Sequence, residues 1–233
     1  MSAAELIILS THAVFEVLGE LGPQFERASG YRLSIGFDPA NAIKRRIDSG
    51  ALFDVAIVTR AVVDQLAGQG VILPDSCVDV ARSGLGISVR KGAPKPDIAT
   101  VDGFKRALLA AKTLVRSRDG SSGIYFDALL DRLGIADEMR GKITVGGSGR
   151  VAEYVARGDV DMAVQQISEL VPVTGADYAG PFPAELQLYT MFSAGVGAAS
   201  KHPQAATDFI KFITAPSVGG LYLAKGLEPS TRD

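Results

Sequence analysis

Small polar residues and glycines follow three separate β-rich runs of this chain, and at each place a helical pattern begins. The polar stretches are residues 10–12 (STH), 117–123 (SRDGSSG) and 146–150 (GGSGR), which follow the runs at residues 6–9, 113–116 and 142–145. A helix N-terminus carries unpaired backbone N–H groups and a partial positive charge, so loops of this kind suit a small anion. The chemistry that these residues predict is therefore anion binding.

The candidate ligand residues share one property, which is a hydroxyl, amide, guanidinium, imidazole or backbone N–H donor. The predicted set is Ser10, Thr11, His12, Asn41, Arg118, Ser121, Ser122, Gly123, Ser148, Arg150 and Gln166. A plain N-cap explains one of the two serines in residues 120–123, but it leaves the other serine and both glycines unexplained.

Three arginines, Arg116, Arg118 and Arg150, lie in or beside two of the polar stretches. A planar guanidinium pairs with a carboxylate through two hydrogen bonds, so arginines at one site favour a di- or tricarboxylate over an inorganic oxyanion. The alternative is that they point into solvent. We favour solvent for Arg116 and keep both interpretations for Arg118 and Arg150.

His12 follows two hydroxyl residues at the start of the first helix. Its ring N–H could donate to an anion and, with a perturbed pKa, the ring could move a proton. The alternatives are an exposed residue of the opening turn or a cap on a neighbouring carbonyl.

Composition narrows the function classes. The 233 residues allow one large domain or two of about 100 residues each. A hydrophobic content of 47% and a net charge of −2 indicate an ordinary globular protein and give no reason to expect nucleic acid or an anionic membrane as a partner. No apolar run reaches the roughly 18 to 20 residues that span a bilayer.

Catalytic and cofactor motifs are missing from the sequence. It holds no Gly-x-Ser-x-Gly, His-Glu-x-x-His, Walker or dinucleotide-binding pattern. Metal ligands do not occur at useful spacing, and Cys77 is the single cysteine. We therefore expect no cofactor, no metal site and, as the leading interpretation, no enzymatic activity.

Strand and helix patterns alternate along the chain. Residues 32–37 alternate apolar and polar side chains, Asp38 before Pro39 predicts a helix start, and residues 53–58 (FDVAIV) form a buried strand. Two long glycine-bearing β-like stretches, residues 80–89 and 187–196, flank an inserted α/β segment. This order predicts an α/β doubly wound protein with two lobes, residues 1–82 with 193–233 and residues 83–192.

These features together resemble the type II periplasmic solute-binding proteins, in particular the molybdate- and sulfate-binding branch of ABC transporters. The stretches that carry the resemblance are residues 6–11, 25–30 (FERASG), 47–55 (IDSGALFDV), 154–161 (YVARGDVD) and the last helix with FIKFI at 209–213. The resemblance implies two doubly wound mixed sheets joined by two crossing strands. It also implies a small anion bound in the cleft between lobes that close about a hinge.

The chain departs from that branch in two ligand loops. Residues 37–41 (FDPAN) place proline and alanine where hydroxyl donors are expected, and Asp38 adds negative charge there. Residues 165–168 (QQIS) replace a tyrosine-bearing loop. Both departures count against molybdate and leave a carboxylate ligand as an option.

The leading hypothesis is an anion-binding, monomeric solute-binding protein whose candidate partner is an ABC permease. The alternative is an isomerase on the same scaffold, similar to a relative of this fold that isomerises aconitate, with His12 as the base. A ligand-binding half of a regulator is a third option. The location is expected to be periplasmic if a signal peptide was removed and cytoplasmic otherwise, because residues 1–5 lead directly into a strand.

Overall fold

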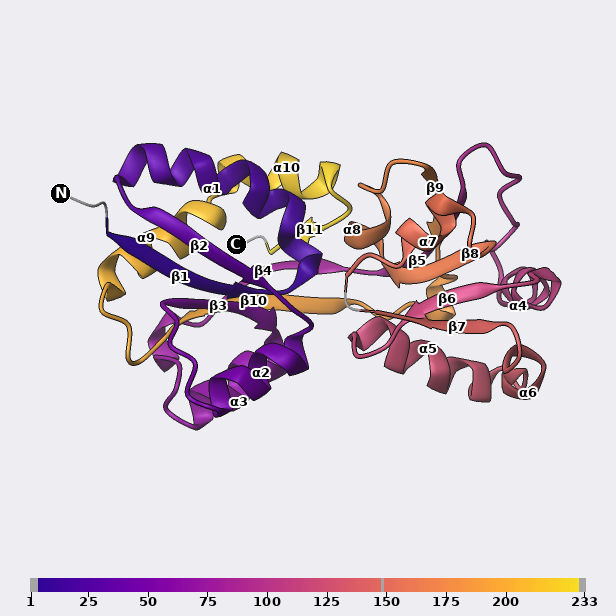
Figure 1. Ribbon diagram of the computed structural model, residues 1–233, viewed down its shortest axis with the longest axis horizontal. Helices are drawn as coiled ribbons and strands as arrows, with labels where there is room; N and C mark the ends of the chain where they lie inside the picture. Colours follow the sequence, from indigo (N-terminus) through magenta and orange to yellow (C-terminus); the bar gives the residue numbers. More distant parts are fainter. Residues whose placement is uncertain (1–3, 148, 231–233) are drawn as a thin grey trace. The chain divides into compact units, whose positions relative to one another are not determined.

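A computed structural model describes residues 4–147 and 149–230 of the chain (Figure 1). The chain divides into two compact units. Unit 1 holds residues 1–82 and 190–233, and unit 2 holds residues 83–189. The polypeptide therefore passes twice between the units, once on the way out and once on the way back.

Unit 1 is built on a six-stranded sheet in the order β11-β4-β10-β3-β1-β2. Its strands are β1 (Glu5–Ser10), β2 (Arg32–Phe37), β3 (Val55–Thr59), β4 (Val78–Ser83), β10 (Thr190–Val196) and β11 (Glu228–Pro229). Its α-helices are α1 (Phe15–Ser29), α2 (Ala40–Asp48), α3 (Arg60–Gly68), α9 (Pro203–Ile213) and α10 (Gly219–Ala224). Short 3-10 turns lie at η1 (His12–Val14), η2 (Pro74–Ser76) and η4 (Pro216–Val218).

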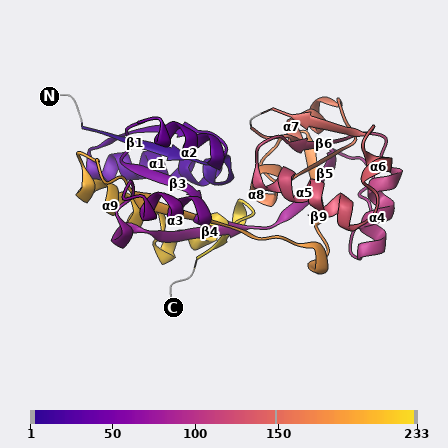
Figure 2. The ribbon, with the colours of Figure 1, turned by 90° about the horizontal axis from the view of Figure 1, so that it is seen from below.

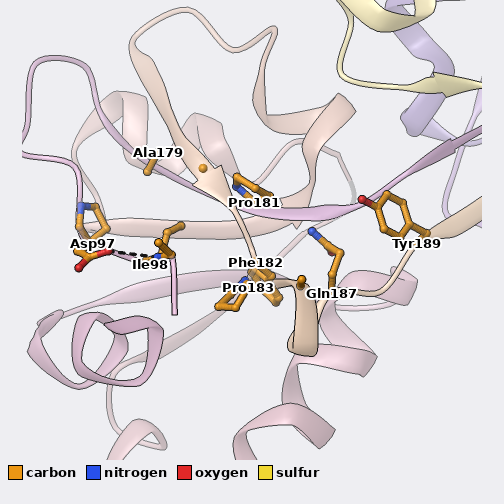
Figure 3. Close-up of a pocket in the computed structure, with 12 residues that line it drawn as sticks. Asp97, Ile98, Ala179, Pro181, Phe182, Pro183, Gln187 and Tyr189 are labelled. Carbon is orange, nitrogen blue, oxygen red and sulfur yellow. Dashed lines mark hydrogen bonds between the residues drawn. The ribbon is translucent and has the colours of Figure 1, made fainter. Parts of the chain in front are cut away.

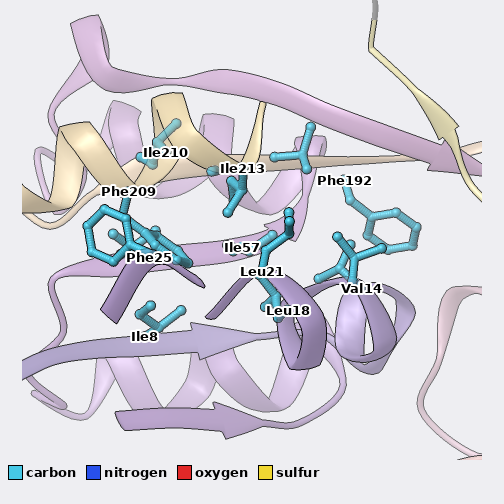
Figure 4. Packing of buried hydrophobic residues seen from close by; sticks show 14 of the residues in the cluster. Ile8, Val14, Leu18, Leu21, Phe25, Ile57, Phe192, Phe209, Ile210 and Ile213 are labelled. Carbon is cyan, nitrogen blue, oxygen red and sulfur yellow. The ribbon is translucent and has the colours of Figure 1, made fainter. Parts of the chain in front are cut away.

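Alternating side chains of the central strands divide the core of unit 1 into two layers. Leu6 and Ile8 of β1 point to the layer formed with α1 and α9, while Leu9 points to the layer formed with α2 and α3. Figure 4 shows the first layer, in which Phe25 of α1 meets Phe209 of α9 with ring centroids 5.1 Å apart. Because both faces are covered by helices, the central strands β1, β3 and β10 are mostly apolar.

Unit 2 is built on a five-stranded sheet in the order β7-β6-β8-β5-β9. Its strands are β5 (Leu85–Arg90), β6 (Leu114–Ser117), β7 (Ile143–Gly146), β8 (Met162–Gln166) and β9 (Ala176–Pro181). Its helices are α4 (Val101–Ala110), α5 (Ser121–Arg132), α6 (Ala136–Met139), α7 (Ala152–Arg157), α8 (Ile167–Leu170) and the 3-10 turn η3 (Ala184–Leu186). Helices α4 and α6 lie side by side in this unit (Figure 2).

The core of unit 2 has the same two-layer construction. Leu114 of β6 packs in the layer that includes α4 and α5, whereas the next residue, Val115, packs in the layer that includes α7. The predicted pair of doubly wound mixed sheets is therefore confirmed. No helix within residues 4–147 and 149–230 combines the length and the apolar character needed to cross a membrane.

Parallel pairing brings the carboxyl ends of three strands to one edge in each sheet. In unit 1, β1 runs parallel to β2 and β3, with Ser10 opposite Phe37 and Ile57. In unit 2, β6 runs parallel to β7 and β8, with Ser117 opposite Gly146. We call these the unit 1 edge, formed by the ends of β1, β2 and β3, and the unit 2 edge, formed by the ends of β6, β7 and β8.

One local prediction needs correction. Asp38 and Pro39 were expected to begin a helix as N-cap and first residue, but α2 begins at Ala40. The N–H groups of Ala42 and Ile43 donate to the Pro39 carbonyl, and the Asp38 carboxylate instead pairs with Arg46 of the same helix at 2.5 Å. The Asp38 carboxylate therefore binds the Arg46 guanidinium and does not cap the backbone N–H groups at the start of α2.

Candidate functional site

The unit 1 edge is fixed by backbone hydrogen bonds at the end of β1. The Thr11 N–H donates to the Ile57 carbonyl at 2.9 Å, and the Ser10 carbonyl accepts from the Asp38 N–H at 3.1 Å. The Ser10 side chain is fully buried, and its hydroxyl donates to the Thr11 carbonyl at 3.2 Å. These bonds hold the two hydroxyl residues where the chain leaves the sheet.

Thr11 carries the clearest unused donor of this edge. Its side chain is 6% exposed, and among the described residues its Oγ1 has no hydrogen-bond partner. A buried hydroxyl without a partner costs about 1–3 kcal/mol. A ligand that supplies an acceptor would remove that cost.

His12 and Asn41 complete the predicted residues of unit 1. His12 is partly buried in η1, and its ring lies 6.0 Å from that of Phe37 between centroids. Asn41 is exposed in the first turn of α2, which follows the end of β2. The Asp38 charge, expected to repel an anion here, is offset by its ion pair with Arg46.

The unit 2 edge brings four of the predicted residues together. The Ser117 and Ser122 hydroxyl oxygens lie 3.1 Å apart in a buried pair, and the Gln166 amide donates to the Ser121 hydroxyl at 3.3 Å. Ser122, Gly123 and Gln166 are buried. The start of α5 is therefore tied to the ends of β6 and β8.

Gly123 has a packing reason to be glycine. A Cβ atom at this position would lie 2.0 Å from the Ser117 carbonyl oxygen, far inside van der Waals contact. The loop before α5 can fold this tightly onto β6 only because the side chain is absent. A ligand role for its N–H group stays a prediction.

The third polar stretch is held by Gln165, a buried residue of β8. Its amide oxygen accepts from the Val151 N–H and its amide nitrogen donates to the Gly149 carbonyl, both at 2.9 Å. Arg150 lies between these two anchored residues and is partly buried. Ser148, a predicted ligand residue, lies outside the described residues.

Glu169 of α8 is a residue of this region that the sequence analysis did not select. Burial raises the pKa of its carboxyl to about 8, and the nearby Arg150 charge acts in the opposite direction. The signal in the sequence was a single acid in the apolar segment after residues 165–168. Its raised pKa comes from burial by other segments of the chain, which a single acid in the sequence does not reveal.

Arg116 and Arg118, which precede α5, differ in their exposure to solvent. Arg116 was expected in solvent, but its side chain is only 15% exposed and pairs with Asp127 of α5 at 2.6 Å. It also donates to the Ser117 carbonyl at 3.0 Å, so it supports the loop before α5. Arg118 is exposed, which agrees with the interpretation that its side chain points into solvent.

A separate cavity of about 600 Å³ lies wholly within unit 2. Its walls come from residues 96–99 and 179–184 together with Gln187 and Tyr189, and Figure 3 shows Ile98, Phe182 and Pro183 among them. None of the predicted ligand residues lines it. Within the described ranges, no three His, Cys, Asp or Glu side chains gather as metal ligands would.

The sequence model of the bacterial extracellular solute-binding proteins matches residues 6–228. That match covers nearly the whole chain, both units included. The chain belongs to this solute-binding protein family.

Relatives agree with this assignment at different levels. The solute-binding protein is 31% identical over 230 residues to an aconitate isomerase of Pseudomonas sp, a match that covers 96% of this chain and 87% of that protein. Many solved structures share its fold, and two of them illustrate the likeness. They are the periplasmic molybdate-binding protein of Azotobacter vinelandii (TM-score 0.81, 18% identity, 98% of this chain and 100% of that chain) and the sulfate-binding protein of Mycobacterium tuberculosis (TM-score 0.76, 16% identity, 97% and 87%).

The structural likeness confirms the type II periplasmic-binding-protein fold that the sequence predicted. At 16–18% identity these neighbours establish the fold and leave the ligand to be argued from the residues of this chain. The placement of the ligand residues at the two edges stays a prediction.

Proposed function

We propose that this solute-binding protein binds a small organic anion with two or three carboxylates. The observation that carries the proposal is Thr11, whose buried Oγ1 lacks a partner among the described residues at the carboxyl end of β1. Ligands of open α/β sheets bind outside the carboxyl ends of the strands, which is where this hydroxyl lies. The unit 2 edge holds a second group of hydroxyl and amide side chains at the carboxyl ends of its own strands.

Charge favours a carboxylate over an inorganic oxyanion. Arg150 lies in the anchored loop of unit 2, and a guanidinium matches a carboxylate with two parallel hydrogen bonds. Pro39 and Ala40 provide no hydroxyl at the unit 1 edge, where recognition of a tetrahedral oxyanion by neutral donors would need one. The aconitate isomerase relative acts, by its name, on a tricarboxylate, which supports the same class of ligand.

Isothermal titration calorimetry with a matched set of anions tests this proposal. The set is tricarballylate, trans-aconitate and succinate against sulfate and molybdate, at one pH and one ionic strength. Binding of a tricarboxylate at least tenfold tighter than either inorganic anion is the expected result. Preference for sulfate or molybdate would contradict the carboxylate assignment while leaving anion binding in place.

A second candidate function is isomerisation of aconitate, which the 31% identical relative favours. In that reaction a base removes a proton from the carbon next to the double bond, the electron pair moves into the adjacent carboxylate-stabilised system, and the proton returns to the far carbon. No redox partner is needed, and His12 is the predicted base. Proton NMR of cis-aconitate with the protein at high concentration decides between turnover and binding alone.

Transport belongs to the proposal as well. The family description as bacterial extracellular solute-binding proteins supports a location outside the cytoplasm, and to this we add the proposal that a monomeric carrier in the periplasm delivers the bound anion to an ABC permease. Co-purification with a membrane permease, and a sedimentation coefficient for a monomer of 24.4 kDa, are the expected results.

A further inference from the structure

Three aromatic rings gather at the unit 1 edge. Phe37 is the last residue of β2 and pairs in register with Ser10, the last residue of β1. The ring of Phe15, the first residue of α1, lies 4.7 Å from the Phe37 ring between centroids, and the His12 ring lies 6.0 Å from it. We call Phe15 and Phe37, with His12 beside them, the aromatic cluster.

The core of unit 1 covers the aromatic cluster only in part. Phe15 is 39% exposed, whereas Phe25 of the same helix is buried against Phe209. Phe37 is partly buried and packs against that core. A single exposed phenylalanine needs no explanation. Two rings in contact at the ends of two strands, however, form an apolar surface that packing within the unit leaves partly open.

The position of this surface favours a small ligand as its occupant. Ligands of open α/β sheets bind outside the carboxyl ends of the strands, and the aromatic cluster lies at the carboxyl ends of β1 and β2. The chain passes directly from Thr11, whose buried Oγ1 has no partner among the described residues, into η1 and then to Phe15. The proposed anion donor and one ring of the cluster therefore come from one short segment, residues 11–15.

The chemistry of the rings decides which part of a ligand they contact. The face of an aromatic ring carries partial negative charge, and its edge carries partial positive charge. The face therefore repels carboxylate oxygens, whereas the apolar carbon atoms of a ligand gain free energy when they leave water against it. A phenylalanine side chain offers no hydrogen bond, so a ligand hydroxyl placed there would lose its water without replacement.

We propose that Phe15 and Phe37 are specificity-determining residues of the anion site, which contact the carbon skeleton of the bound carboxylate and disfavour a hydroxyl group on it. The inference rests on the proposed function and narrows the ligand class to polycarboxylates without a hydroxyl group. It also gives a reason, independent of Arg150, for weak binding of sulfate or molybdate, because these anions have no carbon skeleton to cover the rings.

Calorimetry with tricarballylate and citrate tests the inference, because citrate adds one hydroxyl to the same carbon skeleton and the same carboxylates. Succinate and malate form a second pair with the same difference, for a site that prefers dicarboxylates. We define selectivity as the Kd of the hydroxylated acid divided by the Kd of its partner. In the wild type, selectivity should be about fivefold or more, the order of discrimination that an apolar contact provides.

Phe15→Ala should reduce selectivity to about half or less, because water can then reach the ligand where the ring stood. This variant should stay folded, since the Phe15 side chain is partly exposed and alanine favours a helix. Phe212→Ala is the matched control. Phe212 is also a partly buried phenylalanine of unit 1, but its ring contacts Phe25, which lies about 15 Å along α1 from Phe15. Its loss should lower the melting temperature and leave selectivity unchanged.

The outcomes separate a failure of this inference from a failure of the proposed function. Wild-type selectivity below about fivefold would overturn the inference alone, since the polycarboxylates would still bind. A smaller fall in Phe15→Ala, or an equal fall in Phe15→Ala and Phe212→Ala, would also overturn it alone. No binding of any polycarboxylate by the wild type would overturn the proposed function and the inference with it.

Discussion

The two edges offer hydrogen-bond donors in different ways. At the unit 1 edge, Ser10 donates to the backbone and the Thr11 hydroxyl is left without a partner among the described residues. At the unit 2 edge, Ser117 pairs with Ser122, and Ser121 pairs with Gln166. The difference is that unit 1 holds a buried neutral hydroxyl without a partner among the described residues, whereas in unit 2 the hydroxyls are paired and the loop after β7 carries the positive charge of Arg150.

Gly123→Ala should have the largest effect, because it breaks the architecture of the unit 2 edge. Alanine usually stabilises a helix by up to about 1 kcal/mol relative to glycine. Here its Cβ would meet the Ser117 carbonyl oxygen at 2.0 Å, so the free energy of unfolding should fall by about 3 kcal/mol.

Urea denaturation measures this loss. Gly141→Ala is the matched control, since nothing lies within 4 Å of a Cβ atom there. Equal stability of the two variants would show that the loop before α5 does not need the close approach.

Arg150→Gln should weaken tricarballylate binding by about thirtyfold or more, because removing one partner of a close charge pair costs about 2–5 kcal/mol. The same change removes the positive charge that opposes the raised pKa of Glu169, so that pKa should move higher. Calorimetry measures the affinity of this variant, and a ¹³C NMR titration of the Glu169 carboxyl measures the pKa.

Arg140→Gln serves as the control for Arg150→Gln. Arg140 is 80% exposed and pairs with Asp137, so its loss should leave affinity unchanged. A similar loss of affinity in both variants would mean that net charge, and not the position of Arg150, attracts the anion.

Thr11→Val tests the unit 1 edge with a change of similar shape. Removing a buried hydroxyl that lacks a partner should leave the free energy of unfolding equal or raise it by about 1 kcal/mol. Affinity for the carboxylate should fall about fivefold to tenfold, since one neutral hydrogen bond is lost. Thr144→Val, at an exposed position of β7, should change neither quantity. Loss of stability together with affinity would assign Thr11 to the fold alone.

Much of the fold was predictable because its signals are local. The apolar run at residues 53–58 predicted β3, and the small residues after residue 9 predicted the end of β1. Hydrophobic alternation fixes which face each strand residue covers, and parallel order then places Ser10 at an edge. These steps need no knowledge of distant contacts.

The missed parts of the site depend on residues far apart in the sequence. Glu169 owes its raised pKa to burial, and its helix α8 packs against β5, β8 and β9. Arg116 is held by Asp127, eleven residues away in α5. Periodicity assigns a face to each side chain, but it does not say which neighbour from another element meets it. The expectations for the charged side chains of Arg116 and Asp38 were wrong for this reason.

His12→Gln has the smallest expected effect on binding and the sharpest effect on the choice between functions. Glutamine keeps an N–H donor, so affinity for tricarballylate should fall no more than about threefold. It cannot act as a base near neutral pH, so any turnover of cis-aconitate should disappear. His202→Gln, the only other histidine position in the chain, is the control; its ring contacts Tyr31 at 5.5 Å between centroids in unit 1. Turnover that survives in His12→Gln but is lost in Glu169→Gln would move the base from the unit 1 edge to the unit 2 edge.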